Sequence, residues 1–515
     1  MEIRGFWRAA AAQPERVALI DPDGRRFTAG ELLAAGHELA HGLRALGLAR
    51  GDVVALALPN GAPVFELLLA AMQAGWHLVP INLHLTADEI AYIVRDSGAR
   101  AFFGSERIAD RCARAADAAG VPSFGRFSVG RIPGFRPIEE LRAGRPATEP
   151  AERVAGQIMQ YTSGTTGRPK GVHRDLPPLD PETLIAAYSS HLLKFDITPG
   201  GDHVHLCGSP LYHLAPLAYA WFSLHVEHTV VLLDGWEPSE ALAAIERHRV
   251  TTTHMVPTQF HRLLRLPPEA RARFDVSSLR HVLHAAAPCP VEVKRRMLAW
   301  WGPVIYEYYG ASEGGGTLVK PDEWLRKPGT VGRPWAGADV RVLDDDGKEL
   351  APGMPGTVYL KLLQPFEYRG DPEKTRAARR GEFFTVGDVG YLDDDGYLFL
   401  CDRKIDMIIS GGVNVYPAEI EAVLLTHPSV GDVAVFGVPD DEWGERVKAV
   451  VEPTPGVSAG EPLARELISF CAESLARFKC PGTVDFVDAL PRDPNGKLYK
   501  RRLRDPFWQG RERAI

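Results

Sequence analysis

A loop rich in small hydroxyl residues carries the strongest chemical signal in this sequence. The stretch MQYTSGTTGRPKGV, Met159 to Val172, begins like a buried strand and then collects Thr, Ser and Gly before a single lysine, Lys170. Glycine and small residues let a backbone approach an anion closely, and a lysine supplies a point charge suited to phosphate oxygens. The pattern predicts a cradle for a polyphosphate, made by Thr162, Ser163, Gly164, Thr165, Thr166, Gly167 and Lys170.

This loop differs from the Walker A phosphate loop. Lys170 follows Pro169 rather than a glycine, and no Ser or Thr comes directly after it. The alternative interpretation is a flexible polar surface loop. Its position directly after a strand-like segment favours phosphate binding.

Alternating strand-like and helix-like segments surround the loop. DVVALALPN (residues 52–60) predicts a strand, VFELLLAAMQAG a helix, WHLVPINL a strand and TADEIAYIV the start of a helix. A second series runs from HTVVLLDGW through PSEALAAIERHR and VTTTHMVP to TQFHRLLRL. This order favours an α/β fold with parallel sheets covered by helices. Asp-Gly turns in ADVRVLDDDGKEL and DVGYLDDDGYLFL predict hairpins in a β-rich part between Thr330 and Leu400.

The chain is too long for a single core. At 515 residues it is expected to form two or more domains. We place the boundary near Asp402, which gives a large N-terminal domain of residues 1–401 and a small α+β C-terminal domain of residues 402–515.

Composition excludes several partners. Sixty-six acidic residues against 59 basic ones give a formal net charge of -7, which offers no electrostatic case for nucleic acid or an anionic membrane. Six scattered cysteines without a CxxC pair favour reduced thiols and a cytoplasmic protein. No secretory signal is visible, and the apolar region ELLLAAMQAGWHLVPINL is interrupted well short of the roughly 18 apolar residues that a transmembrane segment needs.

Motifs spread over nearly the whole chain resemble one superfamily. YTSGTTGRPKGV is similar to the phosphate-loop signature of the ANL adenylate-forming enzymes, which comprise acyl-CoA synthetases, peptide-synthetase adenylation domains and firefly-type luciferases. The family's other landmarks follow in order, as YYGASEGG, VGRPWAGADVRV, FTVGDVGYLDDDGYLFLCDR, ISGGVNVYPAEIE and PRDPNGKLYKRRLR. The resemblance implies a multilayered N-terminal domain that binds ATP and the acyl group, and a mobile C-terminal domain that carries a catalytic lysine.

The family reaction has two steps. A carboxylate attacks the α-phosphate of ATP to give an acyl-adenylate and pyrophosphate, and a thiol, usually that of coenzyme A, then displaces AMP. Both steps need phosphate charge to be neutralised more than they need a protein nucleophile. The resemblance therefore implies ATP, Mg²⁺ and coenzyme A.

The resemblance also implies roles for individual residues. The metal ligands are expected to be Glu313 and Thr166, because Mg²⁺ prefers oxygen ligands. The expected catalytic residues are Thr166, Lys170, Glu313 and Lys497. Lys497 follows Pro-Asn-Gly, a tight-turn signal that presents the next side chain, although a lysine in this basic tail could also be merely solvated.

The nucleotide is expected to contact residues of several motifs. The two carboxylate oxygens of Asp388 match the two ribose hydroxyls. Tyr309 either stacks on adenine or belongs to ordinary core packing, and Arg403 either contacts ribose and phosphate or lies on the surface. The expected set, besides the phosphate loop and Lys497, is Ala286, Tyr309, Gly310, Ser312, Glu313, Asp388 and Arg403.

Three positions depart from the family pattern. Ser312 and Val386 each stand where many relatives have Thr, and Ile405 occupies a hinge position that is commonly Lys or Asp. The hinge departure concerns the domain rotation rather than adenylation. After that rotation, Gly411 and Gly412 are expected to let the pantetheine arm of coenzyme A pass close to the backbone.

The acid is predicted to be hydrophobic. Peptide-synthetase domains usually carry an aspartate where this chain has LYHLAP, so an amino acid substrate is disfavoured, and His213 either lines the acyl pocket or packs. Small residues such as Gly314 leave room for the acyl group, and apolar walls favour a buried hydrocarbon by about 0.8 kcal/mol per CH₂. We predict an AMP-forming acyl-CoA synthetase, like fatty-acyl-CoA synthetases, for a medium- or long-chain or bulky acid. The alternatives are an acyl-adenylate ligase that loads a carrier-protein phosphopantetheine arm, and an aryl- or steroid-acid CoA ligase.

Two rivals come from other classes, namely a nucleotide-binding module without chemistry and a phosphoryl-transfer enzyme that releases ADP. The expected partners are the small-molecule acid and coenzyme A. The oligomeric state stays open, with a homodimer as one option.

Overall fold

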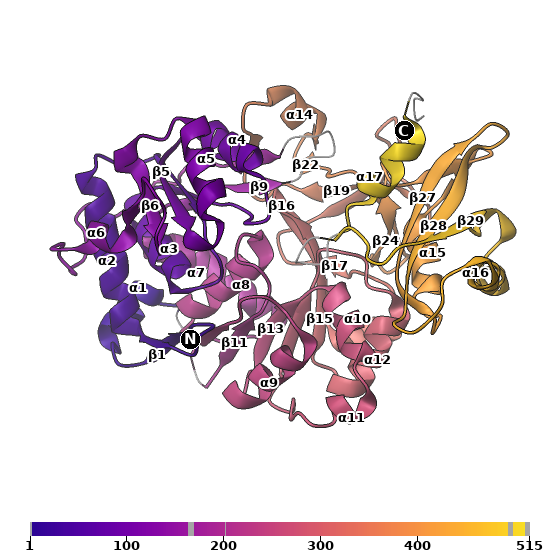
Figure 1. Cartoon of the computed structure of the whole chain (residues 1–515), viewed down its shortest axis with the longest axis horizontal. Coiled ribbons are helices and arrows are strands. Elements are labelled where there is room, and N and C mark those ends of the chain that lie inside the picture. The colour runs from indigo at the N-terminus through magenta and orange to yellow at the C-terminus, as the bar shows by residue number, and fades with distance from the viewer. Residues whose placement is uncertain (1–2, 163–168, 201, 493–497, 510–515) are drawn as a thin grey trace. The chain divides into compact units, whose positions relative to one another are not determined.

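The computed structural model describes residues 3–162, 169–200, 202–492 and 498–509 (Figure 1). The chain forms two compact units, one of residues 1–255, 266–283 and 364–377 and the other of residues 256–265, 284–363 and 378–515. The division predicted near Asp402 remains a prediction. No helix in the described part of the chain combines the length and the apolar character that crossing a bilayer requires.

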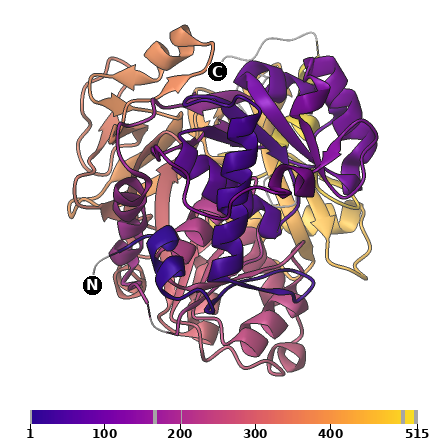
Figure 2. The same ribbon diagram turned by 90° about the vertical axis from the view of Figure 1, so that its left-hand side faces the viewer.

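The first unit contains a six-stranded parallel sheet. Its order is β7-β6-β5-β3-β4-β8. The strands are β3 (Val53–Ala57), β4 (His77–Pro80), β5 (Ala99–Ser105), β6 (Arg126–Val129), β7 (Arg136–Pro137) and β8 (Gln157–Ile158). Four long helices accompany it, namely α2 (Ala29–Ala45), α3 (Ala62–Ala74), α4 (Ala87–Ser97) and α5 (Ala109–Ala119). Figure 2 turns this N-terminal part, coloured indigo to purple, toward the viewer.

Both faces of this sheet are buried because its strand side chains alternate between two cores. Val54 and Leu56 of β3 pack into the core that contains Leu39 and Phe65 of α2 and α3. Val53, Ala55 and Ala57 pack into the opposite core, with residues of α4 and α5. A parallel strand covered on both faces has a continuous apolar sequence, as VVALA does. The predicted strand–helix–strand series is confirmed here.

The first unit also contains part of a larger sheet, in the order β13-β11-β12-β1-β2, in which all the strands are parallel except β2. Its strands are β1 (Val17–Ile20), β2 (Arg26–Thr28), β11 (Val204–Cys207), β12 (Thr229–Leu232) and β13 (Thr252–Met255). Helix α8 (Leu214–His225) connects β11 to β12, and α9 (Pro238–His248) connects β12 to β13. A small antiparallel sheet, β20-β10-β9, is formed by β9 (Gln160–Thr162), β10 (Lys170–His173) and β20 (Glu367–Tyr368). It flanks the phosphate-loop sequence.

The second unit begins with short helices and an antiparallel hairpin. The elements are α10 (Pro257–Arg265), α12 (Val291–Trp301), α13 (Pro321–Arg326), β15 (Ile305–Ala311), β16 (Gly314–Val319) and β17 (Arg333–Pro334). The strand order is β17-β16-β15. The predicted β-rich part follows with β18 (Val340–Leu343), β19 (Gly356–Lys361), β21 (Arg379–Arg380), β22 (Phe383–Phe384), β23 (Asp388–Leu392) and β24 (Leu398–Arg403).

The two predicted Asp-Gly hairpins have different outcomes. The second forms as β23 and β24, which close on the pair Leu392–Leu398. At the first, Leu343 and Glu349 make only an isolated bridge, and β18 pairs along its length with β19 instead. The turn at Asp344 is formed, and the backbone N–H groups of Asp344 and Leu350 bond to the carbonyls of Lys348 and Val342, so the segment after the turn lies along one edge of β18 while β19 pairs with the other edge.

The C-terminal part of the second unit is an α+β sheet, as predicted from the sequence. It contains β25 (Ile408–Ser410), β26 (Val413–Val415), β27 (Val430–Asp440), β28 (Gly444–Pro453) and β29 (Thr483–Phe486), with helices α15 (Pro417–Leu424), α16 (Glu461–Ser474) and α17 (Lys500–Arg504). Along β27, Val433 and Val435 face the core that α15 and α16 share. Ala434 and Phe436 face the opposite core, which includes Leu503 of α17. Figure 1 shows β27 and β28 side by side as long orange strands.

Candidate active site

The strongest cluster of predicted site residues lies in the second unit, around Tyr309 of β15. Its phenolic hydroxyl donates a 2.7 Å hydrogen bond to Oδ2 of Asp388. Burial raises the pKa of Tyr309 and the neighbouring Asp388 carboxylate raises it further, so the hydroxyl stays protonated and remains a donor. The structure thereby joins two residues that belong to different motifs, 79 positions apart.

A third predicted residue completes this cluster. Asp388 begins β23 and Arg403 ends β24, and the two are paired across the hairpin. Nε of Arg403 lies 3.5 Å from Oδ1 of Asp388. One carboxylate oxygen of Asp388 therefore accepts from Tyr309 and the other faces Arg403, and the Asp388 side chain keeps 14% of its surface exposed for further contacts. A carboxylate oxygen can accept two hydrogen bonds, so the group retains capacity for a ligand diol.

The turn between β15 and β16 holds the remaining residues of the YYGASEGG motif. A register shift between Tyr309 and Ala311 marks a bulge, and Ala311 pairs with Gly314 around Ser312 and Glu313. Bulges of this kind re-aim side chains and are frequent beside functional sites. Glu313 is buried, with 5% of its surface exposed, and it takes part in polar interactions within the protein.

Ala286 has a strained backbone. It lies in the exposed loop between β14 (His281–His284) and α12, and its φ of 75° is in the left-handed region. This conformation costs a residue with a Cβ about 1–2 kcal/mol. Such outliers concentrate at ligand-binding sites. Ala286 was predicted to contact the nucleotide.

The described ends of the phosphate loop lie in the first unit. Thr162 ends β9 and Lys170 begins β10, and the two residues are paired across the strands. Nζ of Lys170 lies 3.2 Å from Oδ2 of Asp371. Asp371 also accepts a 2.9 Å bond from the backbone N–H of Lys374, at the start of α14 (Pro372–Ala377). Five predicted loop residues, Ser163, Gly164, Thr165, Thr166 and Gly167, lie outside the described residues, as does Lys497.

Sequence reasoning missed Asp371 and a second residue of the first unit, Gln160. Nε2 of Gln160, on β9, donates a 2.9 Å bond to the carbonyl of Tyr212. This bond ties the strand before the phosphate loop to the segment that contains His213. His213 itself is half-buried, precedes α8 and lies with its ring 4.7 Å from that of Tyr212. A glutamine in a strand of alternating polarity carries no sequence signal of its own.

Gly411 and Gly412 form a two-residue hairpin turn. They connect β25 to β26, where Ser410 pairs with Val413, and their φ values are 57° and 77°. Positive φ at both central residues is the type I′ turn, for which Gly-Gly is a preferred sequence. A Cβ on Gly411 would lie 2.6 Å from the Trp443 ring, whereas the space beside Gly412 is open.

The predicted hinge around Ile405 is held by backbone hydrogen bonds, among them that of the Lys404 N–H to the Gly387 carbonyl. The carbonyl of Ile405 accepts a 3.3 Å bond from Arg504 of α17. Lys404, just before it, makes an exposed 2.6 Å ion pair with Asp345.

Magnesium has one described candidate ligand. The residues that the structure describes contain no group of three or more His, Cys, Asp or Glu able to hold a metal ion. The carboxylate of Glu313 is a suitable ligand for Mg²⁺, because this ion prefers oxygen ligands and usually takes one or two protein carboxylates together with several waters.

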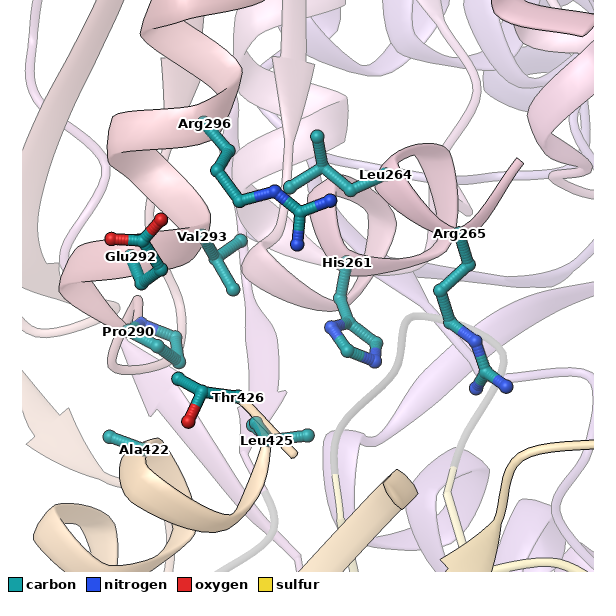
Figure 3. A pocket seen from close by; sticks show the side chains of 10 residues that line it. All are labelled: His261, Leu264, Arg265, Pro290, Glu292, Val293, Arg296, Ala422, Leu425 and Thr426. Atoms are coloured by element: carbon teal, nitrogen blue, oxygen red, sulfur yellow. The ribbon is translucent and has the colours of Figure 1, made fainter. Parts of the chain in front are cut away.

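A small pocket of the second unit lies apart from the predicted residues. It is formed by α10, α12 and α15, as Figure 3 shows, and is lined by His261, Leu264, Arg265, Pro290, Glu292, Val293, Arg296, Ala422, Leu425 and Thr426. His261 and Arg265 both contact the Gly431 carbonyl, at 3.0 and 2.8 Å. None of the residues predicted for the site lines it.

The chain belongs to the AMP-binding enzyme family. The family profile described as AMP-binding enzyme matches residues 6–366, and the profile of the AMP-binding enzyme C-terminal domain matches residues 419–497. The ANL resemblance predicted from the motifs is thus confirmed, as are the fold class and the predicted enzyme class, an AMP-forming acid–thiol ligase.

Similar proteins span most of the chain. A long-chain-fatty-acid–CoA ligase, FadD13 of Mycobacterium tuberculosis, is 35% identical, with 97% of each chain covered. A fatty acid–[acyl-carrier-protein] ligase, ScoC of Streptomyces coeruleorubidus, is 34% identical over 96% of this chain and 94% of that protein. The crystal structure of ATP-bound MatB from Rhodopseudomonas palustris superposes with a TM-score of 0.82 at 30% identity, covering 98% of this chain and 99% of MatB.

Proposed function

We propose that this protein is an AMP-forming acyl-CoA synthetase for a medium- or long-chain or bulky hydrophobic carboxylic acid. The observation that carries the proposal is the Tyr309–Asp388–Arg403 cluster in a member of the AMP-binding enzyme family. Its acid substrate attacks the α-phosphorus of ATP through a carboxylate oxygen, and pyrophosphate leaves. The sulfur of coenzyme A then attacks the acyl carbonyl carbon, AMP leaves, and the thiol proton passes to solvent.

The residues of the second unit bind the nucleoside part of ATP. Asp388 accepts hydrogen bonds from the ribose hydroxyls, while Tyr309 and Arg403 hold its carboxylate in place. Tyr309 and the strained Ala286 loop contact the adenine, and Gly310 and Ser312 complete that surface. A preorganised carboxylate loses little freedom on binding, which strengthens each hydrogen bond it accepts.

Lysine side chains, hydroxyl groups and a bound Mg²⁺ neutralise the charge on the phosphates. Lys170 and the hydroxyls of Thr162, Ser163, Thr165 and Thr166 bind phosphate oxygens, and Lys497 stabilises the charge that develops at the α-phosphate. Glu313 and Thr166 hold Mg²⁺, which supplies positive charge to the phosphates when bound. Asp371 keeps Lys170 in place until the nucleotide arrives.

Coenzyme A enters past the Gly411–Gly412 turn. The positive φ values and the open space beside Gly412 support this role, because a bare backbone lets a slender thiol arm pass. The division into residues 1–401 and a rotating domain of residues 402–515, a cytoplasmic location and a homodimer also belong to the proposal.

The acyl group lies against the apolar α8. Its sequence LAPLAYAWFSLH contains no charged Asp, Glu, Lys or Arg, and His213 stands at its start. A carrier-protein phosphopantetheine arm is the second candidate acceptor. FadD13 is named as a CoA ligase and ScoC as an acyl-carrier-protein ligase, and this chain is almost equally identical to both. An aryl or steroid acid remains the alternative substrate.

The test is ATP–pyrophosphate exchange across a panel of fatty, aromatic and steroid acids, followed by addition of coenzyme A or a phosphopantetheinylated carrier protein. Mass spectrometry should find acyl-CoA, AMP and pyrophosphate. A protein that releases no pyrophosphate with any acid, or that releases ADP, would contradict the proposal. Acylated carrier protein without acyl-CoA would establish the second candidate.

A further inference from the structure

The second unit contains a buried ionic cluster close in sequence to the residues proposed to bind the nucleotide. Nζ of Lys294, on α12, lies 2.6 Å from Oε2 of Glu307, on β15, and Nε2 of His284, at the end of β14, lies 3.4 Å from the same oxygen. Lys294 and His284 are wholly buried, and Glu307 has 5% of its surface exposed. We call these three residues the buried trio.

The trio contains a buried ion pair between Lys294 and Glu307. Burial by itself would raise the pKa of Glu307, but the attraction of Lys294 outweighs burial and lowers that pKa to about 2. Burial lowers the pKa of His284, so its ring is neutral at neutral pH. The Lys294 ammonium also lies 4.7 Å from the centre of the Trp324 ring, on α13.

A buried ionic cluster of this kind contributes little net free energy to folding. Taking two charges out of water is costly, and replacing a buried ion pair with apolar side chains is often neutral or stabilising. A charged pair does impose one geometry, since its hydrogen bond requires a particular distance and direction. The cluster therefore fits a role in positioning.

The trio connects the segments that carry the nucleotide residues. His284 directly precedes the loop with Ala286, and Lys294 is in the helix that follows this loop. Glu307 is two residues before Tyr309 on β15, and alternate strand residues point to the same face. One carboxylate thus ties both ends of the Ala286 loop to the strand that aims Tyr309 at Asp388.

We propose that Glu307, held by Lys294 and His284, is a positioning residue that fixes the Ala286 loop and Tyr309 in the arrangement that binds the adenosine of ATP and AMP. This inference rests on the proposed function only in taking Ala286 and Tyr309 as nucleotide contacts. Glu307 is buried and is assigned no direct contact with nucleotide or acid.

The test measures AMP binding by isothermal titration calorimetry, which needs no knowledge of the acid. The main variant is the double substitution Lys294→Met/Glu307→Met, which removes both charges together. The matched control is Glu292→Gln/Arg295→Gln, which removes the exposed 3.2 Å ion pair of the same helix. Thermal unfolding is recorded for each protein.

We expect the double variant to fold and to bind AMP at least tenfold more weakly, while the control binds as the wild type does. A folded double variant with wild-type affinity would overturn the inference, since a purely stabilising trio changes the melting temperature alone. If the double variant does not fold, the isosteric Glu307→Gln decides in the same way, with a loss of at least threefold expected. A wild-type chain that binds no AMP would instead contradict the proposed function.

Discussion

The hydroxyl of Tyr309 donates to a carboxylate oxygen of Asp388 over 2.7 Å, and Arg403 lies 3.5 Å from the other oxygen. An aromatic residue expected to stack on adenine thus also orients the acid expected to bind ribose. The two halves of a nucleoside would be recognised by one connected group of side chains. Removing the hydroxyl of Tyr309 should therefore also weaken ribose binding by Asp388.

Tyr309→Phe tests this coupling. The variant keeps the ring but leaves one oxygen of Asp388 without its donor, and hydrogen bonds to charged groups contribute about 1.5–3 kcal/mol. We expect the KM for ATP in pyrophosphate exchange to rise about tenfold, with a smaller change in kcat. Tyr308→Phe, whose side chain points to the other face of the strand, is the control. Equal KM values for the two variants would argue against the coupling.

Lys170 and Asp371 form an ion pair whose members have different expected roles. Lys170→Met removes the charge that binds phosphate, and we expect pyrophosphate exchange to fall by about 10²-fold, as is typical when a charge-stabilising donor is lost. Asp371→Asn removes only the partner of Lys170, so the loss should stay below about threefold, in line with a partly exposed ion pair. Similar losses in both variants would mean that the pair matters for anchoring β10.

Lys497→Ala addresses the catalytic lysine directly. The lysine is expected to stabilise charge that develops only in the transition state, so its removal should lower kcat rather than binding. We expect adenylate formation to be abolished while calorimetry shows ATP binding largely retained. Arg501→Ala, an exposed residue of α17, serves as the control for loss of a positive charge in this tail. Unchanged adenylation would remove Lys497 from the mechanism.

Gly412→Val should separate the two half-reactions. Gly412 has φ 77° and open space beside it, so the substitution strains the backbone and blocks the predicted thiol path without a clash. Thioester formation should fall more than adenylation, as measured by acyl-CoA production against pyrophosphate exchange. Gly396→Val is a matched control, because Gly396 also has φ 77° with nothing near it, in the β23–β24 hairpin. Parallel losses of both half-reactions in Gly412→Val would refute the path.

The sequence predicted those elements whose formation depends mainly on residues close together in the chain. The run VVALA predicted β3, and Thr86 with Glu89 forms the capping box at the start of α4, as the sequence TADE indicates. The first Asp-Gly turn formed as predicted, but only the bridge of Leu343 with Glu349 follows it, and the long pairing of β18 is with β19, thirteen or more residues further along the chain. Turn chemistry fixes a turn, whereas strand pairing depends on contacts far away in sequence.

The site followed the same division. Its motif residues, among them Tyr309, Asp388 and Arg403, were predicted by resemblance, but the bonds among them depend on tertiary packing. Residues without a motif were missed. Gln160, Asp371 and Glu307 look like ordinary polar residues in sequence, and only their long-range partners distinguish them.

His205→Asn should change how stability depends on pH. His205 is buried in the first unit, and its Nδ1 lies 3.0 Å from the hydroxyl of Thr252. Burial, with repulsion from His228 and His254, lowers its pKa to about 3, against about 6.5 in the unfolded chain. Below about pH 6.5 only the unfolded state takes up this proton, so the wild type loses about 1.4 kcal/mol per pH unit from this group. The variant lacks that loss. Its deficit in unfolding free energy, measured with urea, should be largest above pH 7 and shrink toward pH 5; a constant deficit would mean that His205 is protonated equally in both states.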